Sequence, residues 1–428
     1  MKMSKIVALI LVVVMSLSAL ASCNIGGGND DGNGNGNASG EHEYAELNGT
    51  YDITMWVSEI DGVDKQFYQQ IDAFMAKYPG IIINAEIEGV TESDAGGQVL
   101  QDVATAPDIY CFAQDQLARL VQASALATPP SKIEAALREA NDAGSIEAAS
   151  VNGKLYAYPL TADNGFFMFY DKSLFNDEDV ESLERIIEIC EENNLKLRFP
   201  LENGWYNAAF FFATGCSSTW TLADDGVFTK LDDNYNSQAG YVAMKAMEKL
   251  AKSNCYDPDN ETYIDAAVII SGTWATNNIE EYFGENYAAT DLPSFVSEVD
   301  GKTYHLSSFS GYKLMGVKPS GDTKRDAVLS LLAQFLTGAD CQLERFNKFA
   351  WGPSNVVAKA NDAVQSSTAL AAFAKQAAYS KPQGQIHGDW WNIAKALGSQ
   401  AKNAKNDQEI WDYLGAYENA SQGLVGKK

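Results

Sequence analysis

Histidine and basic side chains are scarce in this 428-residue chain, and each shortage argues against a class of function. There are only three histidines, and two of them, His305 and His387, lie far apart in the sequence. A His-dependent catalytic triad or a His-rich metal site is therefore not expected. Lysine and arginine number 31 against 57 acidic residues, which gives a formal net charge of −26. Such a chain would repel phosphates, so we expect no binding to nucleic acid.

Local enzyme motifs are absent as well. The sequence contains no G-x-S-x-G, no P-loop, no H-E-x-x-H and no dinucleotide-binding fingerprint. We therefore predict that the protein is not an enzyme and that it holds neither a cofactor nor a metal ion. Glycoside hydrolysis stays open as an alternative, because that reaction requires only two suitably placed carboxyl groups.

The six cysteines are too widely and irregularly spaced to indicate a zinc site or a disulfide framework. Cys111 and Cys190 lie within apolar patterns, which predicts buried side chains. A bridge between Cys216 and Cys255 stays open, although nothing in the sequence supports it. Cys23 differs from the others because it directly follows an apolar N-terminal run.

Export is predicted by the first 23 residues. Lys2 and Lys5 precede an apolar run whose hydrophobic region, about 15 residues long, is too short to span a bilayer comfortably. The run ends in Leu-Ala-Ser-Cys at residues 20–23, which resembles a bacterial lipobox. The resemblance implies that residues 1–22 are a lipoprotein signal peptide and that Cys23 carries the lipid.

A flexible tether is predicted for residues 23–47, which are dominated by Gly, Asn and Asp. This composition cannot bury enough apolar surface to offset the entropy lost on ordering. Residues 31–36 copy the start of an EF-hand calcium loop, but the required twelfth-position glutamate is replaced by His42. The segment is therefore interpreted as a linker.

Strand and helix patterns alternate from Tyr51 onward. Apolar and β-branched runs predict strands at residues 53–57, 81–87 and 107–112, and helical spacing of apolar residues separates them. A turn signal at residues 151–154 predicts a hairpin. The chain is mainly helical after Asp326, with helices expected over 327–336, 369–379, 390–397 and 408–417. The alternation predicts an α/β fold with an open, mostly parallel sheet.

Aromatic residues near strand ends indicate a sugar site. Sugars present apolar C–H faces and hydroxyl groups, so their sites combine flat aromatic rings with a few carboxylates and amides. Phe112, Trp205, Trp274 and Trp391 all lie beside small and polar residues. Phe112 and Asp115 follow a predicted strand, at the edge where open α/β sheets bind ligands.

Several segments, taken in order, resemble the extracellular solute-binding proteins of sugar ABC importers, and among these the maltose/maltodextrin-binding type. They are residues 107–115, 152–159, 170–174, 271–274 and 388–391. The resemblance covers nearly all of the chain after the signal peptide. It implies an α/β, two-lobed periplasmic-binding-protein-like fold with a ligand cleft between lobes that are joined by hinge crossovers.

The resemblance also implies boundaries for the two lobes. The first lobe would comprise residues 48–160 and 310–350, and the second would comprise residues 161–309 and 351–428. The expected hinges are at residues 159–162, 309–312 and 351–354.

Ligand-binding residues are carried over from the same resemblance. It implies stacking by the four aromatic residues and hydroxyl recognition by Asp115 and Asp163. The sequence departs from the family pattern at several positions, because Gln116 replaces an arginine, Phe112 a tryptophan and Trp205 a tyrosine. The full set of candidates is Phe112, Asp115, Gln116, Asp163, Asn164, Trp205, Tyr206, Trp274, Trp391, Glu59 and Asp61.

The implied function is capture of an oligosaccharide, with a maltooligosaccharide as the first candidate, and its delivery to the permease of an ABC importer. The protein would act as a monomer on the extracellular face of the bacterial cytoplasmic membrane, anchored through lipid on Cys23. Two alternatives remain, namely a different oligosaccharide on the same scaffold and a surface glycoside hydrolase.

Overall fold

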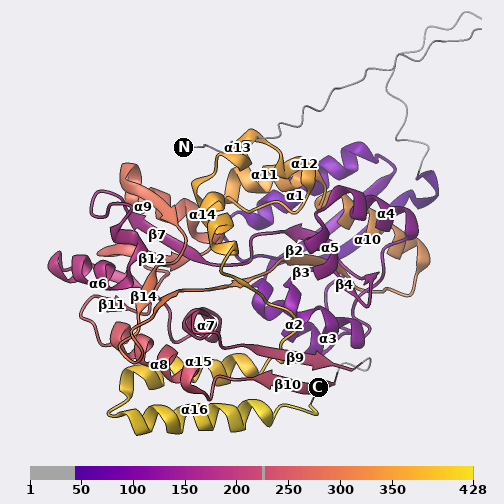
Figure 1. Ribbon diagram of the computed structural model, residues 1–428. Helices are drawn as coiled ribbons and strands as arrows, with labels where there is room; N and C mark the ends of the chain where they lie inside the picture. The colour runs from indigo at the N-terminus through magenta and orange to yellow at the C-terminus, as the bar shows by residue number, and fades with distance from the viewer. Residues whose placement is uncertain (1–43, 224–226, 428) are drawn as a thin grey trace, which may run out of the picture. The chain divides into compact units, whose positions relative to one another are not determined.

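Two five-stranded sheets organise the part of the chain described by the computed structural model, residues 44–223 and 227–427. The signal peptide, Cys23 and the calcium-like segment of the tether lie outside these described residues. Within the same described ranges, no helix combines the length and the apolar character needed to cross a bilayer. The sheets and their flanking helices confirm the predicted α/β class (Figure 1).

The first sheet joins the early strands of the chain to one strand from much later. From edge to edge it consists of β2 (Ile81–Gly89), β1 (Gly49–Val57), β3 (Ile109–Ala113), β17 (Lys313–Val317) and β6 (Tyr158–Thr161). β1 runs parallel to β2 and β3, whereas β17 is antiparallel to both of its neighbours. Because β17 separates β3 from β6, the chain must leave this sheet and return to complete it.

Burial along these strands follows the apolar residues of the sequence. In β1, Ile53, Met55 and Val57 are buried and the residues between them are more exposed, so one face of the strand is covered. β3 and β17 are buried at every position, as expected for central strands that are covered on both faces. α1 (Val63–Lys77) packs against β2 through the apolar stripe that its spacing predicted.

The second sheet repeats the arrangement of the first. Its strands, in spatial order, are β11 (Tyr256–Asp257), β8 (Lys196–Arg198), β12 (Ala266–Ser271), β7 (Phe167–Asp171) and β13 (Tyr287–Thr290). β11, β8 and β12 are parallel, while β7 runs antiparallel to β12 and to β13. In both sheets, therefore, a single antiparallel strand occupies the fourth position.

Four helices pack together beside the second sheet (Figure 1). They are α7 (Gly204–Ala213), α8 (Gln238–Ala251), α15 (Trp390–Asn403) and α16 (Asp407–Gln422). Trp390 is fully buried among them, and its indole donates a hydrogen bond of 2.9 Å to the Tyr417 hydroxyl. A Cβ on Gly398 would lie 1.8 Å from the Leu201 carbonyl oxygen, so glycine is required where α15 meets the chain before α7.

The remaining helices flank the sheets or link them. They are α2 (Glu92–Gln101), α3 (Leu117–Gln122), α4 (Ser131–Ala140), α5 (Ala143–Ala148), α6 (Leu183–Glu192), α9 (Thr276–Phe283), α10 (Thr323–Leu336), α11 (Ala339–Phe349), α12 (Val356–Lys359), α13 (Asp362–Gln365) and α14 (Thr368–Ala377). The four predicted late helices are thus confirmed as α10, α14, α15 and α16, but the pattern missed α11 and the short helices α12 and α13. Segments of four residues carry too little periodicity to be recognised.

Four two-stranded ribbons complete the described part of the fold. They pair β4 (Ser150–Val151) with β5 (Lys154–Leu155), β9 (Ser218–Leu222) with β10 (Phe228–Asp233), β14 (Ser294–Val296) with β15 (Thr303–His305), and β16 (Phe309–Ser310) with β18 (Lys381–Pro382). The first confirms the predicted hairpin. Its turn residues Asn152 and Gly153 both have positive φ, at 51° and 78°, as a tight hairpin turn requires.

Each sheet is surrounded by its own hydrophobic core, and the described cysteines lie within these cores or close to them. Cys111, Cys190, Cys216, Cys255 and Cys341 are all buried free thiols. The Cys255 thiol lies beside the Cys190 thiol and 3.4 Å from the Ser253 hydroxyl. A Cys216–Cys255 bridge is not formed, because both cysteines are free thiols.

Three chain segments run side by side between the two sheets. The Ala162 amide donates to the Gly352 carbonyl at 2.9 Å, and the Asn164 amide donates to the Gly311 carbonyl at 3.2 Å. These contacts join the neighbourhoods of residues 159–162, 309–312 and 351–354. All three segments expected to be hinges thus meet at one place.

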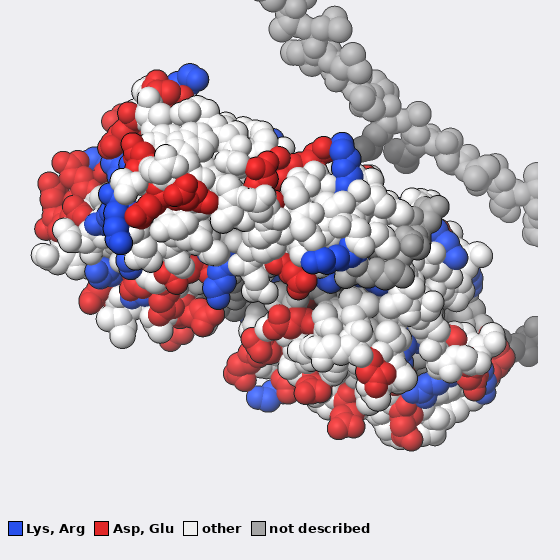
Figure 2. Space-filling model, turned by 90° about the horizontal axis from the view of Figure 1, so that it is seen from below, with Lys and Arg blue, Asp and Glu red and all other residues white. Residues whose placement is uncertain are grey.

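Charged side chains are scattered over the surface. Figure 2 shows one face on which acidic groups are spread over much of the surface with basic groups between them. No broad basic patch gathers on this face of the described chain.

Candidate functional site

Asp115 lies at the carboxyl end of β3, in the short helix η2 (Gln114–Gln116). Its side chain is buried, and its Oδ1 atom has no hydrogen-bond partner among the described residues. Burial raises the pKa of Asp115 to about 7, and the Arg119 guanidinium and a hydrogen bond from the Trp391 indole oppose this rise. Asp115 and Trp391 are therefore in contact although they lie far apart in the sequence.

Asp163 occupies the equivalent place after β6 and ties several segments together. Its Oδ2 atom accepts hydrogen bonds of 2.5 Å from the Thr273 hydroxyl and from the Gly352 amide. The neighbouring Asn164 side chain donates to Gln383 Oε1 at 3.3 Å. One carboxylate oxygen of Asp163 thus links Thr273 to the backbone at residue 352. Trp274 follows Thr273 directly, so this link also fixes the position of Trp274.

Trp205 and Trp274 form a pair of partly exposed rings. Asn203 caps α7 by accepting a hydrogen bond from the Trp205 amide at 2.9 Å, which places Trp205 in the first turn of the helix. Trp274 lies in η4 (Thr273–Ala275), directly after β12. The two ring centroids are 5.9 Å apart with an interplanar angle of 47°.

Two neighbours hold the Trp205 ring in place. The indole Nε1 of Trp205 donates to Gln383 Oε1 at 3.3 Å, and the fully buried Phe166 ring lies 4.8 Å from the Trp205 ring. Gln383 therefore receives hydrogen bonds from both Trp205 and Asn164. It is a contact residue that the sequence did not reveal.

Trp391 lies in the first turn of α15, close to Asp115. Its partly exposed ring makes edge contacts with Phe309 at 5.6 Å and with Trp390 at 5.1 Å. The structure therefore brings Trp391 to the end of β3, while Trp205 and Trp274 lie beside the loop after β6.

Other predicted residues lie elsewhere. Phe112 is fully buried in the core of the first sheet, so it offers no surface to a ligand. The Gln116 amide donates to the Glu92 and Ser93 carbonyls at 2.9 and 2.8 Å and holds α2 in place. The Tyr206 hydroxyl accepts from Asn260 at 3.2 Å, and burial raises the pKa of Tyr206 to about 12.

Glu59 and Asp61 follow β1 and are both exposed. They lie at the carboxyl end of a parallel strand, which is the ligand-binding edge of such sheets. No hydrogen bond in the described chain ties either side chain to Asp115, Asp163 or the tryptophans.

Lys313 and Glu92 were missed by the sequence reasoning. Lys313 begins β17, and its Nζ atom lies 3.3 Å from Glu92 Oε1 and 5.7 Å from the centre of the Trp274 ring. The sequence does contain a signal for Lys313, because this lysine begins the apolar run Lys-Leu-Met-Gly-Val. A charged side chain at the start of a buried strand needs a partner of opposite charge or a hydrogen-bond partner. No local signal pointed to Glu92 as that partner.

The arrangement is suited to binding a polar ligand with apolar faces. The three indoles offer flat surfaces, and the buried oxygen of Asp115 offers a hydrogen-bond acceptor without a partner. Within residues 44–223 and 227–427, no group of three or more histidine, cysteine or acidic side chains is arranged to hold a metal ion.

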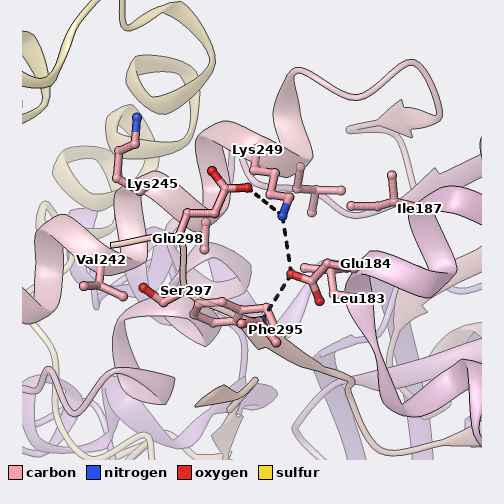
Figure 3. Close-up of a pocket in the computed structure, with 12 residues that line it drawn as sticks. Leu183, Glu184, Ile187, Val242, Lys245, Lys249, Phe295, Ser297 and Glu298 are labelled. Atoms are coloured by element: carbon pink, nitrogen blue, oxygen red, sulfur yellow. Dashed lines mark hydrogen bonds and ion pairs between the residues drawn. The ribbon is translucent and has the colours of Figure 1, made fainter. Parts of the chain in front are cut away.

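A separate surface pocket lies between α6, α8 and β14 (Figure 3). Lys249 bridges Glu298 at 2.8 Å and Glu184 at 3.7 Å across it. The pocket has room of about 20 Å³, enough for roughly one water molecule. None of the predicted ligand-binding residues lines it.

Comparison with known proteins matches the chain to one family. The family model described as bacterial extracellular solute-binding protein matches residues 69–372, more than half of the chain. No match is found among curated proteins.

Solved structures share the whole fold. A structure described as "with acarbose" has 25% sequence identity and a TM-score of 0.74, covering 88% of this chain and 99% of that chain. Maltodextrin-binding protein MalE1 from L. casei BL23, solved without ligand, has 20% identity and a TM-score of 0.72, covering 89% of this chain and 100% of its own. MalE from Bdellovibrio bacteriovorus, bound to maltotriose, has 17% identity and a TM-score of 0.70, covering 87% of this chain and 100% of its own. These likenesses show the two-lobed fold of periplasmic solute-binding proteins.

Proposed function

Because the chain belongs to the bacterial extracellular solute-binding protein family, we propose that it captures an oligosaccharide, with a maltooligosaccharide as the first candidate. The observation that carries this proposal is the pair of partly exposed indoles, Trp205 and Trp274, beside the loop that carries Asp163. Stacked rings bind the C–H faces of sugars, and carboxylates accept hydrogen bonds from their hydroxyl groups.

The ligand site would use a subset of the residues expected from the sequence. We assign stacking to Trp205, Trp274 and Trp391 and hydroxyl recognition to Asp115 and Asn164. Asp163 would orient Trp274 through its hydrogen bond to Thr273. The sugars named for the similar solved structures, maltotriose and acarbose, support this choice of ligand.

Binding would be coupled to movement of the two lobes. Residues 48–160 and 310–350 would form one lobe, and residues 161–309 and 351–428 the other. The hinges would lie at residues 159–162, 309–312 and 351–354, where the crossing segments are hydrogen-bonded to one another. A ligand drives such a closure only if it binds the closed form more tightly than the open form.

Delivery to an ABC permease would follow closure, with the protein held at the extracellular face of the cytoplasmic membrane by lipid on Cys23. The chain itself would break no bond. Neither a nucleophile nor a tuned acid–base pair is required for this role.

Calorimetric titration tests the proposal. A soluble form beginning at His42 is titrated with maltose through maltoheptaose and with acarbose, and the mixtures are then analysed for shortened sugars. We expect one-to-one binding, with the sugar recovered intact.

The other outcomes are equally informative. If no maltooligosaccharide releases or absorbs heat, the choice of sugar is wrong, and other glycans on the same scaffold become the next candidates. Shortened products would mean that the protein is a glycoside hydrolase, and the transport role would have to be abandoned.

A further inference from the structure

A lysine–glutamate pair lies at the edge of the first sheet where the proposed site residues emerge. In the strand ladder, Lys313 is opposite Ala113 of β3 and Thr161 of β6. Ala113 precedes Asp115 by two residues, and Thr161 precedes Asp163 by two. The side chain of Lys313 therefore starts between the two loops that carry these carboxylates.

The pair is almost completely removed from solvent. Lys313 Nζ lies 3.3 Å from Glu92 Oε1, and the two side chains are only 11% and 8% exposed. Glu92 is the first residue of the ten-residue helix α2, where the helix dipole favours a negative charge. The positive charge of Lys313 and the negative charge of Glu92 therefore compensate each other in this buried position.

Two tryptophan rings enclose the ammonium group. Lys313 Nζ is 5.7 Å from the ring centre of Trp274 and 5.4 Å from that of Trp351, within the range of cation–π attraction. Trp274 is one of the proposed stacking rings. A sugar on Trp274 would therefore lie within reach of the ion pair.

Two buried polar atoms beside the pair have no hydrogen-bond partner in the described chain. They are Oγ1 of Thr161, the residue opposite Lys313 in the strand ladder, and Nε1 of Trp351, whose ring centre lies 5.4 Å from Lys313 Nζ. Buried polar atoms are nearly always hydrogen-bonded, to protein, water or ligand. A hydroxyl and an indole N–H without partners beside a charge pair are groups that a polar ligand can bind.

Stability alone does not account for the pair. Removing two charges from water costs about as much as their attraction returns, so apolar residues of similar size stabilise a core at least as well. The position of the pair beside Trp274, a proposed stacking ring, is consistent with a role in ligand recognition.

We propose that Lys313 and Glu92 form a charge-balanced specificity pair that admits neutral sugars at Trp274 and rejects acidic ones. This inference rests on the proposed function. The ammonium donates a hydrogen bond to a sugar hydroxyl, and the carboxylate accepts one from a neighbouring hydroxyl. A carboxylate on the sugar would instead meet the negative charge of Glu92, while the charge of Lys313 is already balanced.

Either charge of the pair can be removed by a single substitution. Glu92→Gln keeps the shape of the side chain but leaves Lys313 uncompensated, so it favours an acidic sugar. Lys313→Gln leaves Glu92 uncompensated and strengthens the rejection. The test is the ratio of affinities for maltotriose and for a trisaccharide of the same backbone with a terminal uronic acid, measured by calorimetry.

We expect the ratio, neutral over acidic, to fall by roughly tenfold in Glu92→Gln and to rise by roughly tenfold in Lys313→Gln. A double variant, Glu92→Met with Lys313→Met, carries neither charge and should lie between the two. Lys318→Gln is the matched control, because Lys318 follows the far end of β17 and is bound to the carbonyls of Ala104 and Ala106. Its ratio should equal that of the wild type.

Circular dichroism identifies any variant that fails to fold, and the remaining two charge variants then decide the question. Unchanged ratios in folded variants, with maltotriose still bound, would overturn the specificity pair and leave sugar binding intact. A wild-type protein that binds neither trisaccharide would overturn the proposed ligand and this inference together.

Discussion

At the scale of single residues, Asp115 combines deep burial with an incomplete set of partners. Burial raises its pKa from 3.8 to about 7. Between these pH values the folded protein holds a proton that the unfolded chain has released. The contribution of Asp115 to the free energy of unfolding is therefore full below about pH 4, declines as the pH rises, and is lost above about pH 7.

We predict that wild-type protein loses about 2–3 kcal/mol of this contribution between pH 5 and pH 8. The loss is about 1.4 kcal/mol for each pH unit between pH 5 and the folded-state pKa of about 7, and it levels off above that pKa. Asp115→Asn, which cannot titrate, should lack this decline. Urea unfolding of both proteins at several pH values measures the difference. Asp72→Asn, at an exposed position of α1, serves as the control and should follow the wild type. Parallel pH profiles for the wild type and Asp115→Asn would contradict the prediction.

The partly exposed tryptophans offer a second residue-scale test. Trp274→Ala and Trp391→Ala should each weaken sugar binding by roughly 1–4 kcal/mol, because each removes an aromatic surface from the ligand. Calorimetry with the preferred sugar measures the loss. Trp411→Ala is a suitable control, since Trp411 lies on α16 and its ring contact among the described residues is with Tyr241 of α8. Full affinity in both folded site variants would remove this site assignment.

At the scale of elements, α11 is fastened to two of the crossing segments by one side chain. The amide nitrogen of Gln342 donates to the Pro159 carbonyl at 3.3 Å and to the Ser354 hydroxyl at 3.1 Å. Its amide oxygen accepts from the backbone of Ser354 at 2.8 Å and of Asn355 at 3.0 Å. Gln342 is buried, so none of these groups can turn to water instead.

Gln342→Met should therefore lower the free energy of unfolding by about 2–4 kcal/mol, since it leaves several buried backbone groups without partners. The midpoint of urea unfolding measures the effect. Gln408→Met, at an exposed position of α16, should change stability by less than about 0.5 kcal/mol. A loss in Gln342→Met no larger than in this control would show that the crossing segments hold together without Gln342.

At the scale of the whole molecule, the tether and the folded part should act independently. Residues 24–40 are rich in Gly, Asn and Asp and should supply reach from the membrane rather than contacts with the ligand. Deleting these residues is expected to leave sugar affinity unchanged within error, as measured by calorimetry. A large loss of affinity on deletion would show that the segment takes part in binding.

Much of the fold was predictable because it depends on local patterns. Apolar periodicity identified β1, α1 and four of the late helices (α10, α14, α15 and α16), and the Asn152–Gly153 turn was recognisable from its residue types. The placement of β17 between β3 and β6 was not predictable in this way. A strand pattern states that a strand exists, whereas its neighbours depend on packing across the whole chain.

The residues of the candidate site were likewise only partly predictable from local patterns. Asp115, Trp205, Trp274 and Trp391 could be selected from the sequence because they follow strands or begin helices beside small and polar residues. By itself, therefore, the sequence determined the α/β class and the segments that carry these side chains. Residue type and periodicity are sufficient for that.

Only the tertiary structure decided which of these side chains meet. In the folded chain Phe112 is buried in the core, and the Gln116 amide donates a hydrogen bond to the backbone of α2. Lys313 forms an ion pair with Glu92 beside Trp274. These outcomes depend on contacts between segments far apart in the chain. Such contacts are set by how two sheets and their helices fill space together, and no local pattern records them.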